Sequence, residues 1–427
     1  MNPTPPTIAA SKPPQAVASA SRPGGSRVAE LALVMVFLAL LASGFLVQTA
    51  VELRRGEGLS ALEVFHQKPT SANLRAYEHH LEDTSVVARA LRPLFQFVQF
   101  AWLHDGGEKA LVGRDGWLFY KPGCDDLVER HSGPATNDPV VAIVAWRDAL
   151  AARGIQLLVL PAPNKESIYP DHLTRRMAPG KVMMSPTTRD LFSRLRSANV
   201  ECVDLSAVFA EARTNAALAG RAPLYLAQDS HWSPAGAALA ARTVARRLAE
   251  KGWVRSGQTR YREKSAPVER AGDVLRMLQS AQIEQAFALE RVPSVQVLRD
   301  DTSQPYQDQS DSEILVLGDS FLRIYQQDEP GSAGFLAHLA KELKQPLTSL
   351  VNDGGASTLV RQELHRRPAL MKHKRVVVWE FVERDIRLGT EGWQQVPLPD
   401  GTLASQRDAA QIAARENLDN LLGLNER

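Results

Sequence analysis

The sequence has few cysteines and none of the common cofactor or metal motifs. Its 427 residues include two cysteines, Cys124 and Cys202, and no C-x-x-C pair, which excludes zinc-ribbon and thioredoxin-like sites. Because H-E-x-x-H, G-x-G-x-x-G and P-loop motifs are also missing, we expect no bound metal and no cofactor. Two interpretations of the cysteines stay open: one disulfide in an oxidising compartment, or two small buried apolar side chains.

Excess charge of one sign is also missing. The 50 Lys and Arg residues nearly balance the 48 Asp and Glu residues, which leaves a net charge of +2, and they form no long basic stripe. This excludes the basic surface that is typical of nucleic-acid-binding proteins. A hydrophobic content of 44% and a charged content of 23% are typical of a folded protein with one large domain or two smaller ones.

One segment near the N-terminus, residues 31–51, contains no charged residue at all. About 20 apolar residues, rising about 1.5 Å each, cross the ~30 Å hydrocarbon core of a bilayer. The apolar region of a cleaved signal peptide is shorter, so we expect an uncleaved signal anchor that crosses the membrane once. The preceding leader is rich in Pro, Ser and Ala and carries Lys12, Arg22 and Arg27, so we expect it to be disordered and cytoplasmic.

Strand-like and helix-like segments alternate through the rest of the chain. Residues 155–160, 314–317 and 375–381 are short, mostly apolar runs, which are typical of buried parallel strands. Helical segments are expected at 140–153 and 237–251. A helix at 186–198 and a short strand at 200–205 complete this pattern. Strands that alternate with helices predict a parallel sheet in a three-layer α/β domain.

Two short polar motifs contain the groups needed for acyl transfer. Asp229 stands two residues before His231, and such residues point to the same side of an extended segment. Ser320 comes just after the predicted strand 314–317, at the end where α/β proteins place their active sites. These are the three groups of a Ser-His-Asp site. Each motif alone also has a structural interpretation, as a solvated turn around Asp229 or as a helix cap formed by Asp319 and Ser320.

The two motifs resemble those of a known family. The string D-S-H-W at 229–232 is similar to the D-x-H-W signature of periplasmic polysaccharide O-acetyltransferases of the AlgJ/AlgX type. The string G-D-S-F at 318–321 is similar to the nucleophile motif of that group. Segments 113–120, 160–170 and 377–384 also resemble family segments and occur in the same order. The resemblance covers roughly residues 105–390.

This resemblance implies an SGNH hydrolase-like α/β fold in a permuted order, because Asp229 and His231 precede Ser320. It implies a Ser-His-Asp triad that transfers acetyl groups, through an acetyl ester on Ser320, to an exopolysaccharide such as alginate or acetylated cellulose. Two other functions stay open: a carbohydrate acetylesterase of the SGNH class, which uses the same residues, and a non-catalytic subunit of a polysaccharide secretion complex.

Further residues are candidates for the oxyanion site and the substrate site. The backbone N–H of Ser320 and the loop with Asn352, Gly354 and Gly355 are candidates to hold the oxyanion, with an ordinary tight turn as the alternative for this loop. Trp232, together with Trp117, is a candidate for an apolar face that binds sugar, with core packing as the alternative.

The resemblance also implies partners and a location. They are a polysaccharide substrate and a membrane acyltransferase of the MBOAT type as acetyl supplier. The protein would lie in the bacterial inner membrane, with its catalytic domain in the periplasm. The predicted organisation is a leader (1–27), an anchor (28–55), a helical membrane-proximal segment (56–105), the SGNH-like acetyltransferase domain (106–400) and a helical tail (401–427).

Overall fold

The computed structural model describes residues 27–66, 68, 70–128, 137–215, 222–353, 355–388 and 392–399. The chain divides into two compact units, Met1–Arg92 and Pro93–Arg427. The predicted tail and all of the predicted leader except Arg27 lie outside the described residues. The domain limits expected from the sequence stay predictions.

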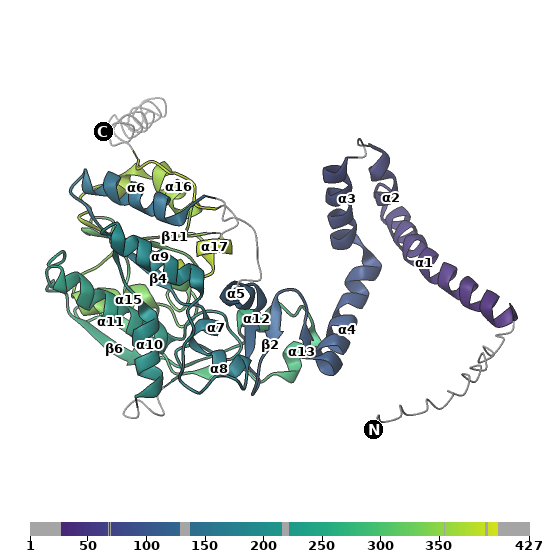
Figure 1. The fold of residues 1–427 in the computed structure, drawn as a ribbon, viewed down its shortest axis with the longest axis horizontal. Helices are drawn as coiled ribbons and strands as arrows, with labels where there is room; N and C mark the ends of the chain where they lie inside the picture. Colours follow the sequence, from purple (N-terminus) through teal and green to yellow (C-terminus); the bar gives the residue numbers. More distant parts are fainter. Residues whose placement is uncertain are drawn as a thin grey trace, which may run out of the picture. The chain divides into compact units, whose positions relative to one another are not determined.

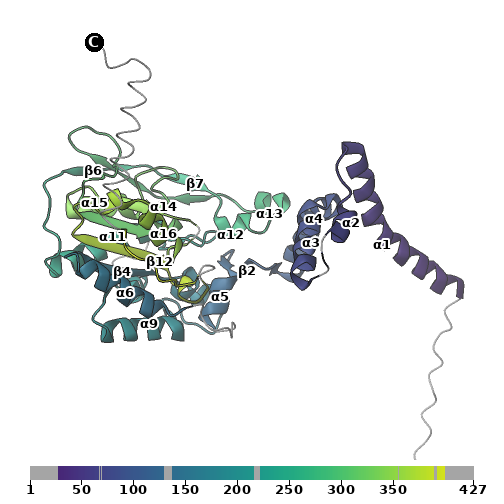
Figure 2. The same cartoon turned by 90° about the horizontal axis from the view of Figure 1, so that it is seen from above.

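A five-stranded sheet with the order β11-β10-β12-β4-β5 forms the centre of the second unit (Figures 1 and 2). Every neighbouring pair in it is parallel, which confirms the predicted sheet type. Its strands are β4 (Gln156–Ala162), β5 (Glu201–Cys202), β10 (Ile314–Gly318), β11 (Thr348–Val351) and β12 (Val376–Val382). Strand β5 is shorter than predicted because Asp204 caps a helix directly after it, accepting a hydrogen bond from the Ser206 N–H at 2.8 Å.

Helices cover both faces of this sheet, because successive strand residues point to opposite sides. Leu158 and Leu160 of β4 belong to one apolar cluster, whereas Leu157 and Val159 belong to another. The first cluster is covered by α10 (Leu205–Thr214), α11 (Pro234–Glu250) and α15 (Phe335–Leu343). The second is covered by α6 (Pro139–Ala151), α9 (Pro186–Ser197) and α16 (Leu359–Arg366). The predicted three-layer α/β architecture is therefore confirmed.

Small antiparallel pieces lie outside the main sheet. Strands β1 (Asp105–Gly106), β2 (Ala110–Val112) and β3 (Leu118–Tyr120) form one sheet. Strand β6 (Tyr261–Ser265) pairs with β9 (Val295–Arg299), and β7 (Val268–Arg270) pairs with β8 (Glu290–Val292). A third apolar cluster joins Ala110 and Leu118 to α12 (Asp273–Arg276) and α13 (Ala281–Ala286). This cluster holds the chain segment that flanks the candidate site.

The first unit is helical. It contains α1 (Arg27–Arg55), α2 (Ser60–Glu63), a 3-10 turn at Val64–His66 and α3 (Ser71–Thr84), and α4 (Val86–Leu103) begins in it. The stretch Leu31–Arg55 of α1 is 25 residues long, contains an 18-residue window with a mean hydropathy of 2.4, and is long and apolar enough to cross a membrane. This agrees with the predicted anchor.

The disulfide interpretation of the two cysteines is wrong. Cys124, on α5 (Lys121–Leu127), and Cys202, on β5, are both free. Cys124 packs in the apolar cluster on one face of the sheet and Cys202 against the cluster on the opposite face, so the sheet separates the two thiols. Burial raises the pKa of both thiols, which makes them poor nucleophiles.

Candidate active site

Asp229 and His231 lie on a loop before α11 that we call the histidine loop (residues 226–231). An isolated antiparallel bridge between Tyr225 and Trp232 closes it at its base. Directly afterwards Ser233 caps α11, because its Oγ accepts a hydrogen bond from the Gly236 N–H at 3.2 Å. The loop is therefore fixed by a bridge and by a capped helix, which gives its polar side chains defined directions.

Ser320 begins the short helix α14 (Ser320–Arg323), directly after β10. Asp319 caps this helix through a 2.8 Å hydrogen bond from the Phe321 N–H. The Asp319 N–H in turn donates to Glu380 Oε2 on the neighbouring strand β12 at 3.1 Å. A Cβ at Gly318 would lie 2.3 Å from the same oxygen, so only glycine fits there. The helix-cap interpretation therefore holds for Asp319, whereas the Ser320 hydroxyl contacts His231.

The structure brings the three predicted catalytic residues together. His231 Nδ1 lies 2.8 Å from Asp229 Oδ1, and His231 Nε2 lies 2.8 Å from Ser320 Oγ. Asp229 Oδ1 also accepts a hydrogen bond from the backbone N–H of His231 at 3.0 Å, which fixes the position of the carboxylate relative to His231. Asp229 is fully buried and Ser320 is partly exposed. A carboxylate, an imidazole and a hydroxyl in this order are arranged for nucleophilic acyl transfer.

Two further charged residues lie beside the hydrogen-bonded relay of Asp229, His231 and Ser320. Arg270 on β7 lies 3.2 Å from Asp229 Oδ2. Asp273, at the start of α12, accepts hydrogen bonds from the N–H and the Oγ of Ser230, both at 2.6 Å, and lies 3.5 Å from His231 Nδ1. The sequence does not predict Asp273 as a site residue, because its local pattern does not show which loop it faces.

These charges set the pKa values of the relay. Burial alone would raise the pKa of Asp229, but the hydrogen bond from His231 and the charges of His231 and Arg270 hold it below its usual value. Burial alone would lower the pKa of His231, but the Asp229 hydrogen bond and the charges of Asp273 and Asp229 raise it above 6.5. The carboxylate therefore stays ionised, and the imidazole is a stronger base than a free one.

We expect kcat/KM for a small acetyl ester to fall as the pH drops through a pKa above 6.5, because only neutral His231 can accept the Ser320 proton. Since the Asp273 charge contributes to the raised pKa, Asp273→Asn should move this acidic limb to lower pH. Steady-state pH profiles of the two proteins check this. If the acidic limb of the Asp273→Asn profile stays in place while activity still requires His231, Asp273 does not raise the pKa of His231.

Asp229, His231 and Asp273 place ligand atoms within 4.8 Å of one another, the only such metal-competent group among the described residues. Protein groups already contact these atoms. His231 Nδ1 and Arg270 contact the Asp229 oxygens, and Ser230 contacts the Asp273 oxygens. These three side chains therefore suit a relay of hydrogen bonds better than a metal ion site.

Lys165, at the start of α7 (Lys165–Ile168), holds the histidine loop through its side chain. Its Nζ donates to the backbone oxygens of Leu226, Ala227 and Asp229 at 3.0, 3.0 and 2.7 Å. The side chain is 1% exposed, and burial lowers its pKa to about 8. A buried ammonium needs such partners, and here it finds them in one short loop. The motif at 160–170 thus acts through Lys165 on the position of Asp229.

Glu290 on β8 holds the same loop through its N–H groups. Its two carboxylate oxygens accept the N–H groups of Ala227 and Gln228, both at 2.8 Å. The motif at 113–120 adds a third attachment, because the Leu118 N–H donates to the Ala227 oxygen at 2.8 Å. Three chain segments that are remote in the sequence therefore fix one loop.

Lys165→Met is expected to lower the free energy of unfolding by about 2–4 kcal/mol, because it removes charge-assisted bonds from buried carbonyl groups. It should also lower kcat more than it changes KM, since Asp229 loses its support. Urea denaturation and ester kinetics measure both effects. Lys374→Met is the matched control: that buried lysine donates to the oxygens of Ser310 and Ser312, away from the site, and its loss should reduce stability alone.

A cleft of about 490 Å³ opens beside His231. Its charged lining residues are Glu269, Arg270, Asp273, Arg276, Arg323, Asp328 and Glu329. Most of them come from the β7–α12 segment and from the chain after α14, so a polar cleft with charges of both signs lies beside His231.

The predicted oxyanion role of the loop after β11 is not supported. Val351 pairs with Gly318, so the loop begins beside the strand end that precedes Ser320. However, the Asn352 N–H donates to the Gly318 oxygen at 3.0 Å, and the Gly355 N–H donates to the Asn352 oxygen at 3.2 Å. Gly354 lies outside the described residues. The tight-turn interpretation therefore holds for Asn352 and Gly355. The Ser320 N–H, in the first turn of α14, stays a candidate because such groups have no partner within their helix.

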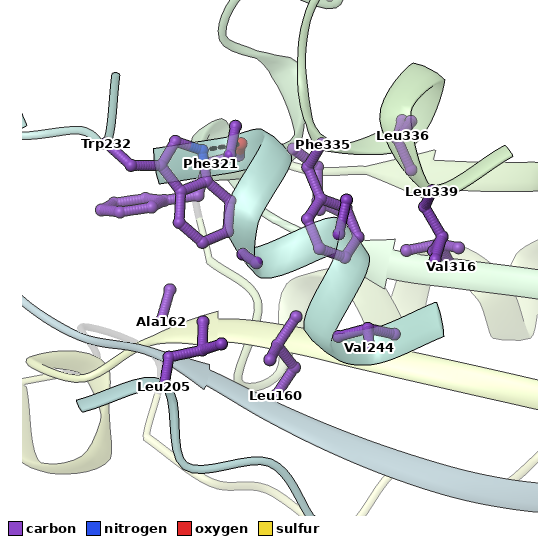
Figure 3. Close-up of a cluster of buried hydrophobic side chains, with 14 of the residues drawn as sticks. Leu160, Ala162, Leu205, Trp232, Val244, Val316, Phe321, Phe335, Leu336 and Leu339 are labelled. Atoms are coloured by element: carbon purple, nitrogen blue, oxygen red, sulfur yellow. Dashed lines mark hydrogen bonds between the residues drawn. The ribbon is translucent and has the colours of Figure 1, made fainter. Parts of the chain in front are cut away.

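The predicted sugar-binding role of Trp232 is wrong. The side chain is fully buried, and its Nε1–H donates to the Phe321 oxygen at 3.0 Å (Figure 3). Its ring packs against Phe321 and Phe335, with centroid distances of 5.1 and 5.7 Å. Trp232 instead connects the end of the histidine loop to α14. Trp117 is half-buried and stacks on His172 at 4.2 Å.

Comparisons with known proteins show what this chain is similar to. A family model described as an SGNH hydrolase-like domain of the acetyltransferase AlgX matches residues 110–383, which include Asp229, His231 and Ser320. Among solved structures, the O-acetyltransferase domain of Pseudomonas putida AlgJ superposes with a TM-score of 0.51 at 20% identity, over 65% of this chain and 92% of that domain. The predicted SGNH hydrolase-like fold is therefore confirmed.

Curated relatives are similar at modest identity. The probable alginate O-acetylase AlgJ of Pseudomonas aeruginosa is 28% identical over 173 residues, which cover 40% of this chain and 40% of that protein. The protein of the same name from Pseudomonas putida is 24% identical over 326 residues, or 73% of this chain and 78% of the relative. The first alignment thus spans less than half the length of the Pseudomonas aeruginosa protein.

Proposed function

Because the chain belongs to the family of SGNH hydrolase-like, AlgX-type acetyltransferase domains, we propose that it transfers acetyl groups to hydroxyl groups of an exopolysaccharide. The observation that supports this most directly is the relay from Asp229 through His231 to Ser320, with both hydrogen bonds at 2.8 Å. The names of the relatives favour alginate or a similar polymer as the acceptor.

In the first half-reaction, Ser320 Oγ attacks the carbonyl carbon of an acetyl donor while its proton passes to His231 Nε2. Asp229 keeps the ring in the tautomer with the proton on Nδ1 and stabilises the imidazolium that forms. The Ser320 N–H is placed to help hold the oxyanion of the tetrahedral intermediate. The leaving group departs with the proton from His231, and an acetyl ester stays on Ser320.

In the second half-reaction, a sugar hydroxyl attacks the acetyl ester. His231 Nε2 takes the proton of that hydroxyl and returns it to Ser320 Oγ as the C–O bond to the serine breaks. The acetylated sugar leaves, and the enzyme is regenerated. The cleft beside His231 is the route by which such a hydroxyl would approach.

The two alternatives differ from this proposal in the fate or the formation of the acetyl ester. An acetylesterase would release the acetyl group to water, with the same three residues. A non-catalytic subunit of a secretion complex would form no acetyl ester at all. The bonded geometry of Ser320, His231 and Asp229 favours an enzyme over the non-catalytic role.

Full-length protein incubated with a small acetyl ester and oligosaccharides is expected to produce acetylated oligosaccharide, because a transferase must favour a sugar hydroxyl over water. Mass spectrometry of uronic-acid and glucan oligomers detects the product, and Ser320→Ala protein is the control. Steady hydrolysis of the donor without acetylation of any oligomer would make the acetylesterase the better assignment.

We also propose that α1 anchors the protein in the inner membrane with the catalytic domain in the periplasm, where an MBOAT-type acyltransferase would supply acetyl groups. The apolar stretch Leu31–Arg55 supports the anchor. A reporter that is active only in the periplasm, fused after Arg427, should be active. Activity from a cytoplasmic reporter at the same position would reject this topology.

A further inference from the structure

Helix α4 presents an apolar face that the described protein does not cover. Leu91, Leu94, Phe95, Val98 and Trp102 recur at three- and four-residue spacing, so they lie on one side of the helix. Val98 is half-buried, and the others range from 42% exposed at Leu91 to 81% at Trp102. We call these five residues the α4 face. Exposed apolar side chains gathered in this way mark a surface that contacts something else.

The opposite side of α4 packs within the second unit, to which Pro93 and the residues after it belong. Phe100, which lies on that side, packs edge-to-face on Phe287 with a centroid distance of 5.9 Å, and it contacts the third apolar cluster. Among the described residues, the α4 face therefore points away from the part of the second unit on which α4 packs.

The first turn of α4 is bonded to α1. The Val86 N–H donates to Gln48 Oε1 at 2.8 Å, and Gln48 Nε2 donates to Glu52 Oε1 at 2.7 Å. Gln48 and Glu52 lie at the C-terminal end of the apolar stretch Leu31–Arg55, where charged side chains resume. If α1 crosses a membrane, α4 therefore begins at the level where the lipid ends.

The composition of α4 matches a lipid surface. The helix contains no acidic residue; its charges are Arg89 and Arg92, and Arg92 borders the α4 face. Helices that lie in the membrane interface combine basic flanks with Leu, Phe and Trp on the buried side, and Trp is enriched at the head-group level. A protein partner would meet the same apolar side chains, but it would not account for the link to α1.

We propose that the α4 face inserts into the membrane that α1 crosses, on the side where α1 ends, at the boundary between head groups and acyl chains. The catalytic unit would then have a second membrane contact beside its anchor. This inference rests on the membrane crossing of α1 and not on the acetyltransferase activity.

Site-specific labels on the full chain in lipid nanodiscs test this proposal. Cys124 and Cys202 are first replaced by alanine, and an environment-sensitive fluorophore is attached at Phe95→Cys or Trp102→Cys. Leu38→Cys in α1 is the positive control, and Ser197→Cys, exposed on α9, is the negative control. Retained ester hydrolysis shows that each labelled protein is folded. Lipids brominated at different depths then quench only labels that contact acyl chains.

Loss of most emission at positions 95 and 102, strongest with bromines near the head-group end of the chain, is the expected result. The label at 197 should not respond, and the label at 38 should respond most to deep bromines. Quenching at 38 but not at 95 or 102 would overturn the proposal. In that case, blue-shifted emission at 95 and 102 would assign the α4 face to a protein partner or a second copy, and water-like emission would leave it solvated. Absence of quenching at position 38 would contradict both the membrane crossing of α1 and the proposal that rests on it.

Discussion

Ser320→Ala is expected to reduce turnover of a small acetyl ester by at least about 10⁴-fold, because no other hydroxyl among the described residues is bonded to the base. His231 Nε2 has Ser320 Oγ as its partner at 2.8 Å, and the serine sits at a capped helix start with little freedom to move. The double variant Ser320→Ala/His231→Ala should lose little more than the single variant, since the two residues act as one unit.

The structural cost of Ser320→Ala should be small. The hydroxyl is partly exposed, and Asp319, not Ser320, caps α14. An unchanged urea midpoint alongside the lost activity would therefore separate catalysis from folding. Turnover within tenfold of the wild type in a folded variant would show that Ser320 is not the nucleophile. Acetylation of Ser320 in protein quenched during turnover, read by peptide mass spectrometry, gives independent support.

Asp229→Asn is expected to reduce kcat by about 10³–10⁴-fold while the fold persists. An amide at this position can donate to His231 Nδ1, which places the ring proton on Nε2 and leaves no lone pair to accept the Ser320 proton. The buried position excludes water, which would otherwise replace the lost acceptor. Loss of the charge beside Arg270 adds to the effect.

Asp273→Asn is the matched control, because both carboxylates approach the same ring nitrogen. Asp229 lies at 2.8 Å and Asp273 at 3.5 Å, where Asp273 is committed to Ser230. We expect Asp273→Asn to lower kcat by no more than about tenfold, an effect of ~1.4 kcal/mol. Equal losses in the two variants would show that the carboxylates share the orienting role.

The sequence is sufficient to predict the parts of this protein that depend on local patterns. Buried parallel strands read as apolar runs between turn residues, and such runs predict β4, β10 and β12. Asp229 and His231 are two residues apart, so their proximity is also visible in the sequence. Their contact with Ser320 is expected because the serine ends a strand and because the family resemblance joins the two motifs.

The sequence does not predict contacts between segments that are remote from one another along the chain. An apolar aromatic residue beside a catalytic motif looks the same whether it faces sugar or core, and Trp232 packs on Phe321. A lysine pattern does not distinguish a solvated side chain from Lys165, whose partners lie more than 60 positions away. The disulfide interpretation failed because nothing local shows on which face of the sheet each cysteine lies.

The way in which the histidine loop is held has a consequence for its motions. Its backbone N–H groups at Ala227, Gln228, Ser230 and His231 all donate to side-chain carboxylates, not to a helix or a strand. Amide hydrogen exchange at these four positions therefore reports the breaking of hydrogen bonds to acidic side chains. A segment without regular secondary structure should then exchange as slowly as the core strands at neutral pH. Protection of the Ser230 N–H should fall in acid, where Asp273, whose pKa is raised mainly by burial, gains a proton while the sheet is still closed.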